Sequence, residues 1–304
     1  MLRSLLVPLD GTRFSEYALP LAEGVARATG AALHLAHVHV PHPPVALLSN
    51  TQFHFEGLDL DDYETQDRRV ERHYLAAMAE RVGREAAAPV DTALLEGEVP
   101  ATLNRYCREV GADAVVLATH SRAGARRAWM GSVAEALIRA GNVPVLTVHA
   151  DETGDVGPPL QISNILVPLD GSELAEGVLP AVTELAMCCD ARITLLHVLT
   201  HRHPAPGGMV PALPEQWANA LDRGEEYMDG VAARVRGRGL RADTVVLAQP
   251  NPAEAIREVA EESRADLVAM ATHGYTGLRR VLFGSVAEEV LRHGTIPMLI
   301  VRPG

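Results

Sequence analysis

The sequence contains one long segment twice, and this repeat restricts the fold more than any other feature does. The segment SLLVPLDGT at residues 4–12 recurs as NILVPLDGS at residues 164–172, an offset of 160 positions. Residues 118–149 recur as residues 271–302, an offset of 153 positions, and about half of these residues are identical. Duplication explains this similarity. We therefore expect one fold twice, with the second copy seven residues shorter in its middle.

A short acidic segment rich in Gly and Pro separates the two copies. It reads ADETGDVGPPL at residues 150–160, a composition that is typical of linkers. The length of 304 residues also exceeds that of one ordinary domain. We expect one domain at residues 1–150, called copy 1, a linker at residues 151–160, and a second domain at residues 161–304, called copy 2.

Short apolar runs alternate with segments of helical spacing in both copies, as in α/β domains with parallel sheets. The expected strands are residues 4–8, 32–38, 90–94, 114–117 and 145–148 in copy 1, and 165–168, 193–198, 244–247, 267–270 and 298–301 in copy 2. The expected helices of copy 1 are residues 15–28, 67–87, 101–110 and 133–139. The strands are apolar nearly throughout, which indicates that helices cover both faces of each sheet. We expect an α/β fold with two doubly wound parallel five-stranded sheets.

The charged residues exclude several classes of function. All 27 basic residues are Arg, and the absence of Lys rules out a Walker-type phosphate lysine, a Schiff-base lysine and a lysine general base. The formal net charge of −12 repels polyanions. We therefore expect neither nucleic acid nor an anionic membrane surface as a partner.

The cysteines and the N-terminal segment favour a cytoplasmic protein. Cys107, Cys188 and Cys189 are odd in number and two of them are neighbours, which suits a reducing compartment better than a disulfide framework. We favour a packing role for them over a redox role for the Cys188–Cys189 pair. The first apolar run is too short for a signal peptide or a membrane span, so we expect no targeting segment.

Residues that could bind a phosphate follow the strands of copy 2, at the edge where doubly wound sheets bind ligands. Asp170 follows the first strand, and nine residues separate Gly274 from the Gly284–Ser285 pair. Gly284 allows a ligand to approach the backbone, and we expect Ser285 to cap a helix whose free N–H groups attract phosphate. The alternative is a capped helix after a plain connection, with Asp170 only setting a turn. The residues alone leave both interpretations open.

The motifs VPLDGS at the end of strand one, HV at the end of strand two, and ATHG followed by nine residues and GSVAEEVL resemble the universal stress protein family. The resemblance covers essentially the whole chain, twice. It implies a Rossmann-like fold of the adenine-nucleotide alpha-hydrolase type. It also implies that the last strands, residues 144–148 and 297–301, pair across a twofold. A tandem chain can satisfy that contact internally, and two chains can then associate as a homodimer.

The resemblance also implies a binding site for ATP, with Mg²⁺ held through the phosphates and water. In copy 2 it places adenine near Val198, ribose near Asp170 and phosphates on the loop and the helix start. The implied nucleotide-binding residues of copy 2 are Pro168, Asp170, Val198, Met270, Ala271, His273, Gly274, Gly284, Ser285, Val286 and Ala287. Ala271 stands where the ATP-binding branch of the family has the first Gly of its loop.

Copy 1 departs further from the family pattern. Ala118 replaces the first Gly of the loop and Ser121 replaces the second, so we expect a weaker second nucleotide site there. The corresponding residues are Pro8, Asp10, Val38, His120, Gly131, Ser132 and Val133.

Histidines recur near both expected sites. His37 and His39 share one face of the second strand by period two, near His34 and His42, but only His37 has a counterpart in copy 2, His197. We therefore favour packing and solvent exposure over a zinc site and predict no metal ligand. For His120 and His273 we favour a loop-ordering role over catalysis, because no nucleophile or paired carboxylate accompanies them, and we predict no catalytic residue.

Three functions remain open from the sequence. The favoured one is an ATP-binding regulatory or stress-response module, because it explains the glycine-containing loop without a catalytic base. The second is a slow ATP hydrolase or adenylate-transferring enzyme in which Arg279 or Arg280 stabilises phosphoryl charge. The third is a nucleotide-free dimerisation and protein-interaction scaffold of the same family, with an unidentified protein partner. The long stretches at residues 41–66 and 203–214 are candidate lids or partner surfaces.

Overall fold

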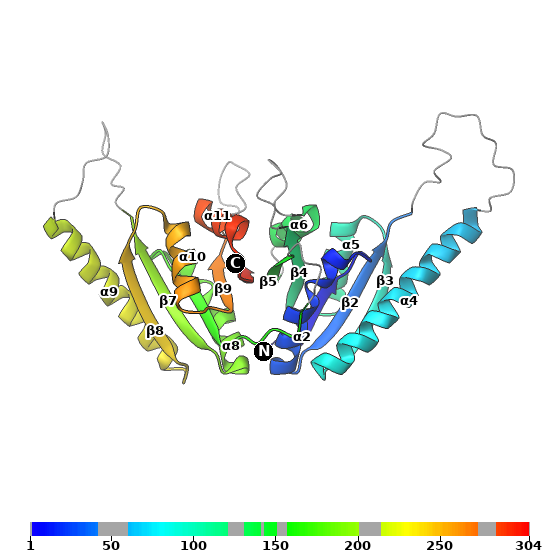
Figure 1. Cartoon of the computed structure of the whole chain (residues 1–304), viewed down its shortest axis with the longest axis horizontal. Helices are drawn as coiled ribbons and strands as arrows, with labels where there is room; N and C mark the ends of the chain where they lie inside the picture. The colour runs from blue at the N-terminus through cyan, green and yellow to red at the C-terminus, as the bar shows by residue number, and fades with distance from the viewer. Residues whose placement is uncertain are drawn as a thin grey trace, which may run out of the picture.

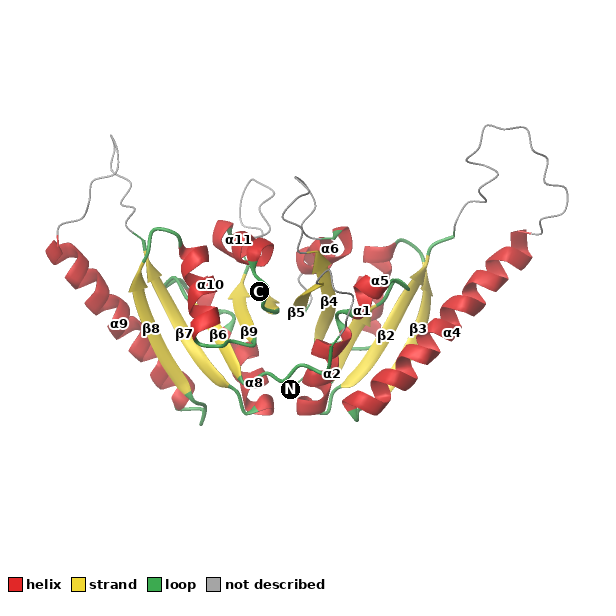
Figure 2. Cartoon of the chain, viewed as in Figure 1, coloured by secondary structure: helices red, strands yellow, loops and turns green. Residues whose placement is uncertain are grey.

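The computed structural model describes residues 2–41, 60–120, 131–140, 143–150, 157–200, 214–272 and 284–303. The ten described strands form one sheet in the order β3-β2-β1-β4-β5-β10-β9-β6-β7-β8 (Figure 2). Their bounds are β1 (Ser4–Pro8), β2 (Ala32–His39), β3 (Val90–Glu96), β4 (Ala114–His120), β5 (Val145–Ala150), β6 (Asn164–Pro168), β7 (Arg192–Leu199), β8 (Ala242–Ala248), β9 (Leu267–Ala271) and β10 (Met298–Val301).

The sheet is parallel within each copy and antiparallel only where the copies meet. The order 3-2-1-4-5 in copy 1, and its mirror in copy 2, is the doubly wound arrangement that was predicted. The two expected five-stranded sheets are joined, however, because β5 and β10 pair antiparallel with Leu146 opposite Leu299. This pairing gives a hydrogen-bonding partner to an edge strand of each copy. The predicted contact between the last strands is therefore made within one chain.

Helices cover both faces of the sheet, which explains why the strands are apolar on both sides. Leu5 and Val7 of β1 face the core under α2, α4, α8 and α9, whereas Leu6 faces the core under α5, α6, α10 and α11. Figure 1 shows the two copies as the arms of a V, with α4 and α9 along the outer sides. The helix bounds are α1 (Arg13–Glu16), α2 (Leu19–Thr29), α4 (Leu60–Ala86), α5 (Val99–Glu109), α6 (Ser132–Ala140), α7 (Glu173–Glu176), α8 (Leu179–Cys189), α9 (Pro214–Arg236), α10 (Pro252–Glu262) and α11 (Ser285–His293).

The first helix of each copy is interrupted, which corrects the prediction of one helix at residues 15–28. A one-turn helix, α1, ends at Glu16, and α2 begins at Leu19 with Pro20 in its first turn. Proline has no backbone N–H and cannot donate the hydrogen bond that a continuous helix would place on the carbonyl of Glu16. Pro180 interrupts the corresponding helix of copy 2 in the same way.

Two reciprocal hydrogen bonds connect the copies beside the β5–β10 pair. His149 Nε2 at the end of β5 bonds to the carbonyl of Leu291 in α11 at 2.6 Å. Arg302 Nη1, after β10, donates to the carbonyl of Arg139 in α6 at 2.6 Å. Both contacts are made to carbonyls in the last turn of a helix, where donors from outside the helix are needed.

Among the described helices, none is long and apolar enough to cross a membrane.

Candidate functional site

A cleft opens in copy 1 beyond the carboxyl ends of β1, β2 and β4. Its volume is about 660 Å³, which is typical of small-molecule sites. Because β1 pairs with both β2 and β4, the ends of these strands meet where the strand order reverses, the usual ligand position in doubly wound sheets. The lining brings together six of the residues predicted for this copy: Pro8, Asp10, Val38, Gly131, Ser132 and Val133.

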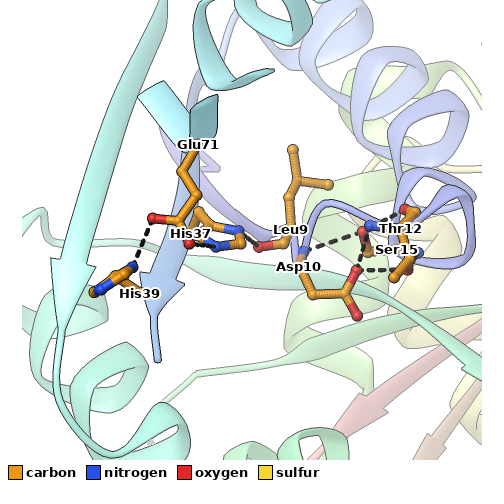
Figure 3. Close-up of polar contacts among 7 residues, drawn as sticks. All are labelled: Leu9, Asp10, Thr12, Ser15, His37, His39 and Glu71. Carbon is orange, nitrogen blue, oxygen red and sulfur yellow. Dashed lines mark hydrogen bonds and ion pairs between the residues drawn. The ribbon is translucent and has the colours of Figure 1, made fainter. Parts of the chain in front are cut away.

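Asp10 is held by a tight turn that leaves part of its carboxylate available. Asp10 Oδ1 accepts hydrogen bonds from Thr12 N at 2.9 Å and Thr12 Oγ1 at 2.5 Å, while Ser15 Oγ accepts from Asp10 N at 3.1 Å (Figure 3). Gly11 completes the turn with φ of +80°, a conformation that favours glycine. Among the described residues, no hydrogen bond is made to Asp10 Oδ2. The carboxylate is thus oriented and can accept a hydroxyl from a ligand in the cleft.

The start of α6 forms the opposite wall of the cleft. Glu135 N donates to Gly131 O at 3.0 Å, and the N–H groups of the first helical turn precede this bond and lack intrahelical acceptors. Ser132, Val133 and Ala134 line the cleft. A Cβ placed on Gly131 would meet no atom within 4 Å. The fold therefore does not require glycine here, whereas a ligand seated close to the backbone would.

Glu71 and His37 line the cleft beside Val38, and His39 lies behind them. His37 Nδ1 bonds to the carbonyl of Leu9 at 2.9 Å and His37 Nε2 to Glu71 Oε1 at 3.2 Å. His39 Nδ1 bonds to the other oxygen, Glu71 Oε2, at 2.8 Å (Figure 3). Both histidines are buried, with 8% and 2% of their surface exposed. Their predicted common face is confirmed, and it packs on α4 instead of facing solvent.

Glu71 was not predicted as a site residue. It lines the cleft together with His37 and Val38. The helices α4 and α9 align at the same offset of 153 positions as the C-terminal repeat. This alignment allows Glu71 to be compared with the residue at its position in copy 2. Matched tyrosine contacts fix this alignment: Tyr74 donates to Glu16 Oε1 at 3.2 Å, and Tyr227 donates to Glu176 Oε1 at 3.0 Å.

Burial is the main cause that raises the pKa of both tyrosines, Tyr74 and Tyr227, above the usual range, and the adjacent glutamates, Glu16 and Glu176, raise it further. Both phenols are therefore protonated donors at neutral pH. The α4–α9 alignment places Gly224 of copy 2 at the position of Glu71.

Copy 2 repeats the turn and the helix start but not the carboxylate. Asp170 Oδ1 accepts from Ser172 N at 2.9 Å and from Ser172 Oγ at 2.6 Å. His197 Nδ1 bonds to the carbonyl of Leu169 at 2.7 Å, as His37 does to Leu9. A Cβ on Gly224 would lie 3.2 Å from His197 Cδ2, so the side of the ring that meets Glu71 in copy 1 meets a glycine here.

The helix start of copy 2 corrects the expected role of Ser285. Gly284 is the N-cap of α11 and no side chain caps the helix; Ser285 is its first helical residue. Its hydroxyl therefore lies one position too late to cap, and the first-turn N–H groups stay open to an external acceptor.

The remaining predicted residues of copy 2 lie on adjacent elements. Pro168 ends β6, Val198 lies at the end of β7, and Met270 and Ala271 end β9, which pairs with β6. Val286 and Ala287 follow Ser285 in the first turn of α11. His273, Gly274, Arg279 and Arg280 lie outside the described residues, as do most of the two candidate lid stretches. His120 ends β4, opposite Ala150 of β5.

His34 does not join His37 and His39 at Glu71. His34 is directed to the other side of the strand, with Nδ1 3.8 Å from Asp91 Oδ2 and its ring edge-on to Tyr106. His42 lies outside the described residues. Within the described part of the chain, no group of three or more histidine, cysteine or acidic residues is arranged to hold a metal ion.

Comparison with known proteins identifies the family. The model of the universal stress protein family matches the chain twice, at residues 1–149 and 161–302. The chain belongs to the universal stress protein family. A universal stress protein of Mycobacterium tuberculosis (strain CDC 1551 / Oshkosh) is 26% identical over 315 residues, covering 98% of this chain and 94% of that protein. One from Methanocaldococcus jannaschii is 32% identical over 139 residues, covering 45% of this chain and 81% of the relative.

The fold is also that of solved universal stress proteins. A crystal structure of one from Archaeoglobus fulgidus DSM 4304 superimposes with a TM-score of 0.70 at 16% identity, covering 99% of this chain and 98% of that one. At this identity the likeness concerns the fold alone. It extends over both copies, so the tandem arrangement of the family is shared.

Proposed function

We propose that this universal stress protein is an ATP-binding regulatory module in which each copy, residues 1–150 and 161–304, is a nucleotide-binding domain. The cleft of copy 1 is the observation that carries the proposal. It combines an apolar wall at Val38, an oriented carboxylate at Asp10 and an open helix N-terminus at Ser132 in one hollow of nucleotide size. These are the three groups that a base, a ribose and a phosphate require.

The placement of ATP follows from those three groups. Adenine packs against Val38 in copy 1 and Val198 in copy 2. The ribose hydroxyls donate to Asp10 and Asp170. The phosphates accept hydrogen bonds from the first turns of α6 and α11, where the helix dipole favours negative charge. Copy 2 binds more tightly, because it keeps Gly274 of the family loop where copy 1 has Ser121.

Magnesium fits this site only as a companion of the phosphates. Asp10 and Glu71 are the carboxylates that line the cleft of copy 1, and Glu71 is engaged by two histidines. Mg²⁺ prefers six oxygen ligands and keeps several waters, so phosphate oxygens and water supply most of its coordination. When bound, the ion neutralises phosphate charge.

Binding of nucleotide then serves as the regulatory event. The starts of α6 and α11 hold the phosphates, and the last turns of the same helices are bonded to the opposite copy through Arg302 and His149. Ligand contacts at one end of each helix are thus connected to the junction between the copies. We propose a cytoplasmic protein whose shape or affinity for a protein partner responds to ATP, without a catalytic role.

Release of bound nucleotide tests this proposal. The purified protein is denatured, and the supernatant is analysed by chromatography for wild type and for Gly131→Asp and Gly284→Asp, whose carboxylates would occupy the phosphate positions. We expect adenine nucleotide in wild type, a partial loss in each single variant and a complete loss in the double variant. A Gly230→Asp variant, at an exposed glycine of α9 where a Cβ would meet no atom within 4 Å, is the matched control, and circular dichroism verifies folding.

The opposite result is equally specific. Protein that is purified without nucleotide and binds no added ATP at millimolar concentration would replace the proposal with a nucleotide-free scaffold. Conversion of bound ATP to ADP above the uncatalysed rate would replace it with a slow hydrolase.

A further inference from the structure

The hydrogen bonds of His37 require an additional proton in the wall of the copy 1 cleft. The carbonyl of Leu9 can only accept, so His37 Nδ1 carries a proton and donates it. His37 Nε2 faces Glu71 Oε1 at 3.2 Å. A neutral ring with its proton on Nδ1 has a lone pair on Nε2, which would repel an ionised carboxylate.

Two protonation states satisfy both contacts of His37, and they contain the same number of protons. In one, His37 is an imidazolium that donates to an ionised Glu71. In the other, Glu71 is a carboxylic acid that donates to a neutral ring. His39 Nδ1 donates to the second oxygen of Glu71 in either state. The His37–Glu71–His39 network therefore holds one proton that it loses when the contact between His37 and Glu71 opens.

The network lies where a ligand of the cleft would sense its charge. His37 and Glu71 both line the cleft, and Val38, the residue placed against the base, lies between His37 and His39 on β2. Only about a fifth of the Glu71 side chain is exposed, so solvent screens its charge incompletely. Loss of the proton adds one negative charge beside the ligand.

The other charged groups around the network do not replace this proton. From α4, Arg68 forms an ion pair with Glu96 of β3 at 2.5 Å, next to His39 in the sheet. Arg81 and Tyr74 contact Glu16 on the α1 side. Asp10, two residues after β1, lines the same cleft, so the cleft holds a second carboxylate and no basic side chain apart from His37 among its described lining residues.

Copy 2 has no such network among its described residues. Gly224 stands at the position of Glu71, and Leu199 stands at that of His39. His197 bonds to the Leu169 carbonyl, and its ring lies edge-on to Tyr227. A neutral His197 satisfies that geometry without an additional proton. The two copies therefore differ at this position by one carboxylate.

We propose that Glu71 makes nucleotide binding in copy 1 proton-linked: the cleft binds the anionic ligand together with the proton of the His37–Glu71–His39 network, whereas copy 2 binds it without one. This inference rests on the proposed nucleotide site. Affinity in copy 1 falls as pH rises and the network loses its proton. For two unit charges on the order of 8 Å apart, the interaction changes the affinity by about twofold to thirtyfold, for effective dielectric constants between about 80 and 20.

Isothermal titration of the full chain with ATP tests the proposal, because copy 2 is an internal control. Gly284→Asp leaves copy 1 as the open cleft, and Gly131→Asp leaves copy 2, so the titration of ATP itself affects both measurements equally. Between about pH 6 and about pH 9, we expect the copy 1 affinity to fall at least about twofold more than the copy 2 affinity. Buffers of different ionisation enthalpy are expected to reveal more proton uptake on binding in copy 1 than in copy 2.

Glu71→Gln in the Gly284→Asp background removes the carboxylate and keeps the side-chain shape. We expect its affinity profile to follow that of copy 2, because an amide at this position satisfies both histidines without the additional proton. Equal pH profiles for the two clefts would overturn the inference and leave the proposed function intact. Failure of both clefts to bind ATP at any pH would overturn the proposed function, and the inference with it.

Discussion

Glu23 gives a quantitative prediction for the stability of copy 1. It lies on α2 with 5% of its surface exposed and lines a cavity of about 380 Å³ with Arg81, Glu85 and the linker residues Pro158 and Pro159. Among the described residues it makes no hydrogen bond or ion pair. Burial raises the pKa of Glu23 from 4.5 to about 7; Arg81 and Arg27 oppose this shift and Glu85 adds to it.

The sign follows from proton linkage. Between pH 4.5 and about 7 the folded protein retains a proton on Glu23 that the unfolded chain has lost. The free energy of unfolding therefore falls as pH rises through this window. The difference between the pKa of Glu23 in the unfolded chain and in the folded protein corresponds to at most about 3 kcal/mol of unfolding free energy. In copy 2 the corresponding Thr183 instead accepts a hydrogen bond from Arg238 at 3.1 Å, without such a cost.

Glu23→Gln removes the charge and keeps the volume. We expect its unfolding free energy to equal that of wild type within about 1 kcal/mol near pH 4.5 and to exceed it by about 2–3 kcal/mol near pH 8. Urea denaturation followed by circular dichroism measures the difference at both pH values. Glu85→Gln, at an exposed side chain on the same cavity, is the matched control and is expected to change little. A Glu23→Gln effect that is independent of pH would refute the reasoning.

Three further predictions concern the cleft and the junction. Asp10→Asn keeps the oxygen that orders the turn but removes the charge, so we expect ATP affinity in copy 1 to fall by about tenfold in isothermal titration, with unchanged melting. Gly24→Ala places a Cβ 1.8 Å from the carbonyl oxygen of Leu160; we expect a loss of about 1–3 kcal/mol in urea unfolding. Gly83→Ala, whose Cβ has only an ordinary contact at 3.7 Å, is its control and should be neutral or stabilising. Arg302→Ala removes the donor to α6, and we expect about 1 kcal/mol lower stability together with faster hydrogen exchange in the last turn of α6.

Much of the fold could be predicted because local patterns determine it. The apolar runs of β1 and β10 have the bounds that the sequence indicated, since Pro8 ends β1 and Pro297 precedes β10. The pairing of β5 with β10 could be predicted only through the family resemblance, because local sequence patterns do not indicate which edge strands meet in space. The break before α2 depends on Pro20, a signal present in the sequence that the helical spacing of residues 15–28 obscured.

The candidate site was only partly predictable. Asp10 and Gly131 were predicted through the family resemblance, because the turn and helix-start patterns alone are equally consistent with a structural role. Glu71 lies in the middle of a long polar helix, where a glutamate ordinarily faces solvent. Its role arises from the packing of α4 on β2, which brings it against His37 from a distance of 34 positions. Whether Ser285 caps α11 likewise depends on a difference of one residue in the start of the helix, which begins at Ser285 itself.

A crystal structure of the protein with a non-hydrolysable ATP analogue tests the central claim most directly. The account predicts a purine against Val38 and Val198, ribose hydroxyls within hydrogen-bond distance of Asp10 and Asp170, and phosphates at the first turns of α6 and α11. Clefts that stay empty at millimolar analogue, or a nucleotide bound elsewhere on the chain, would contradict it.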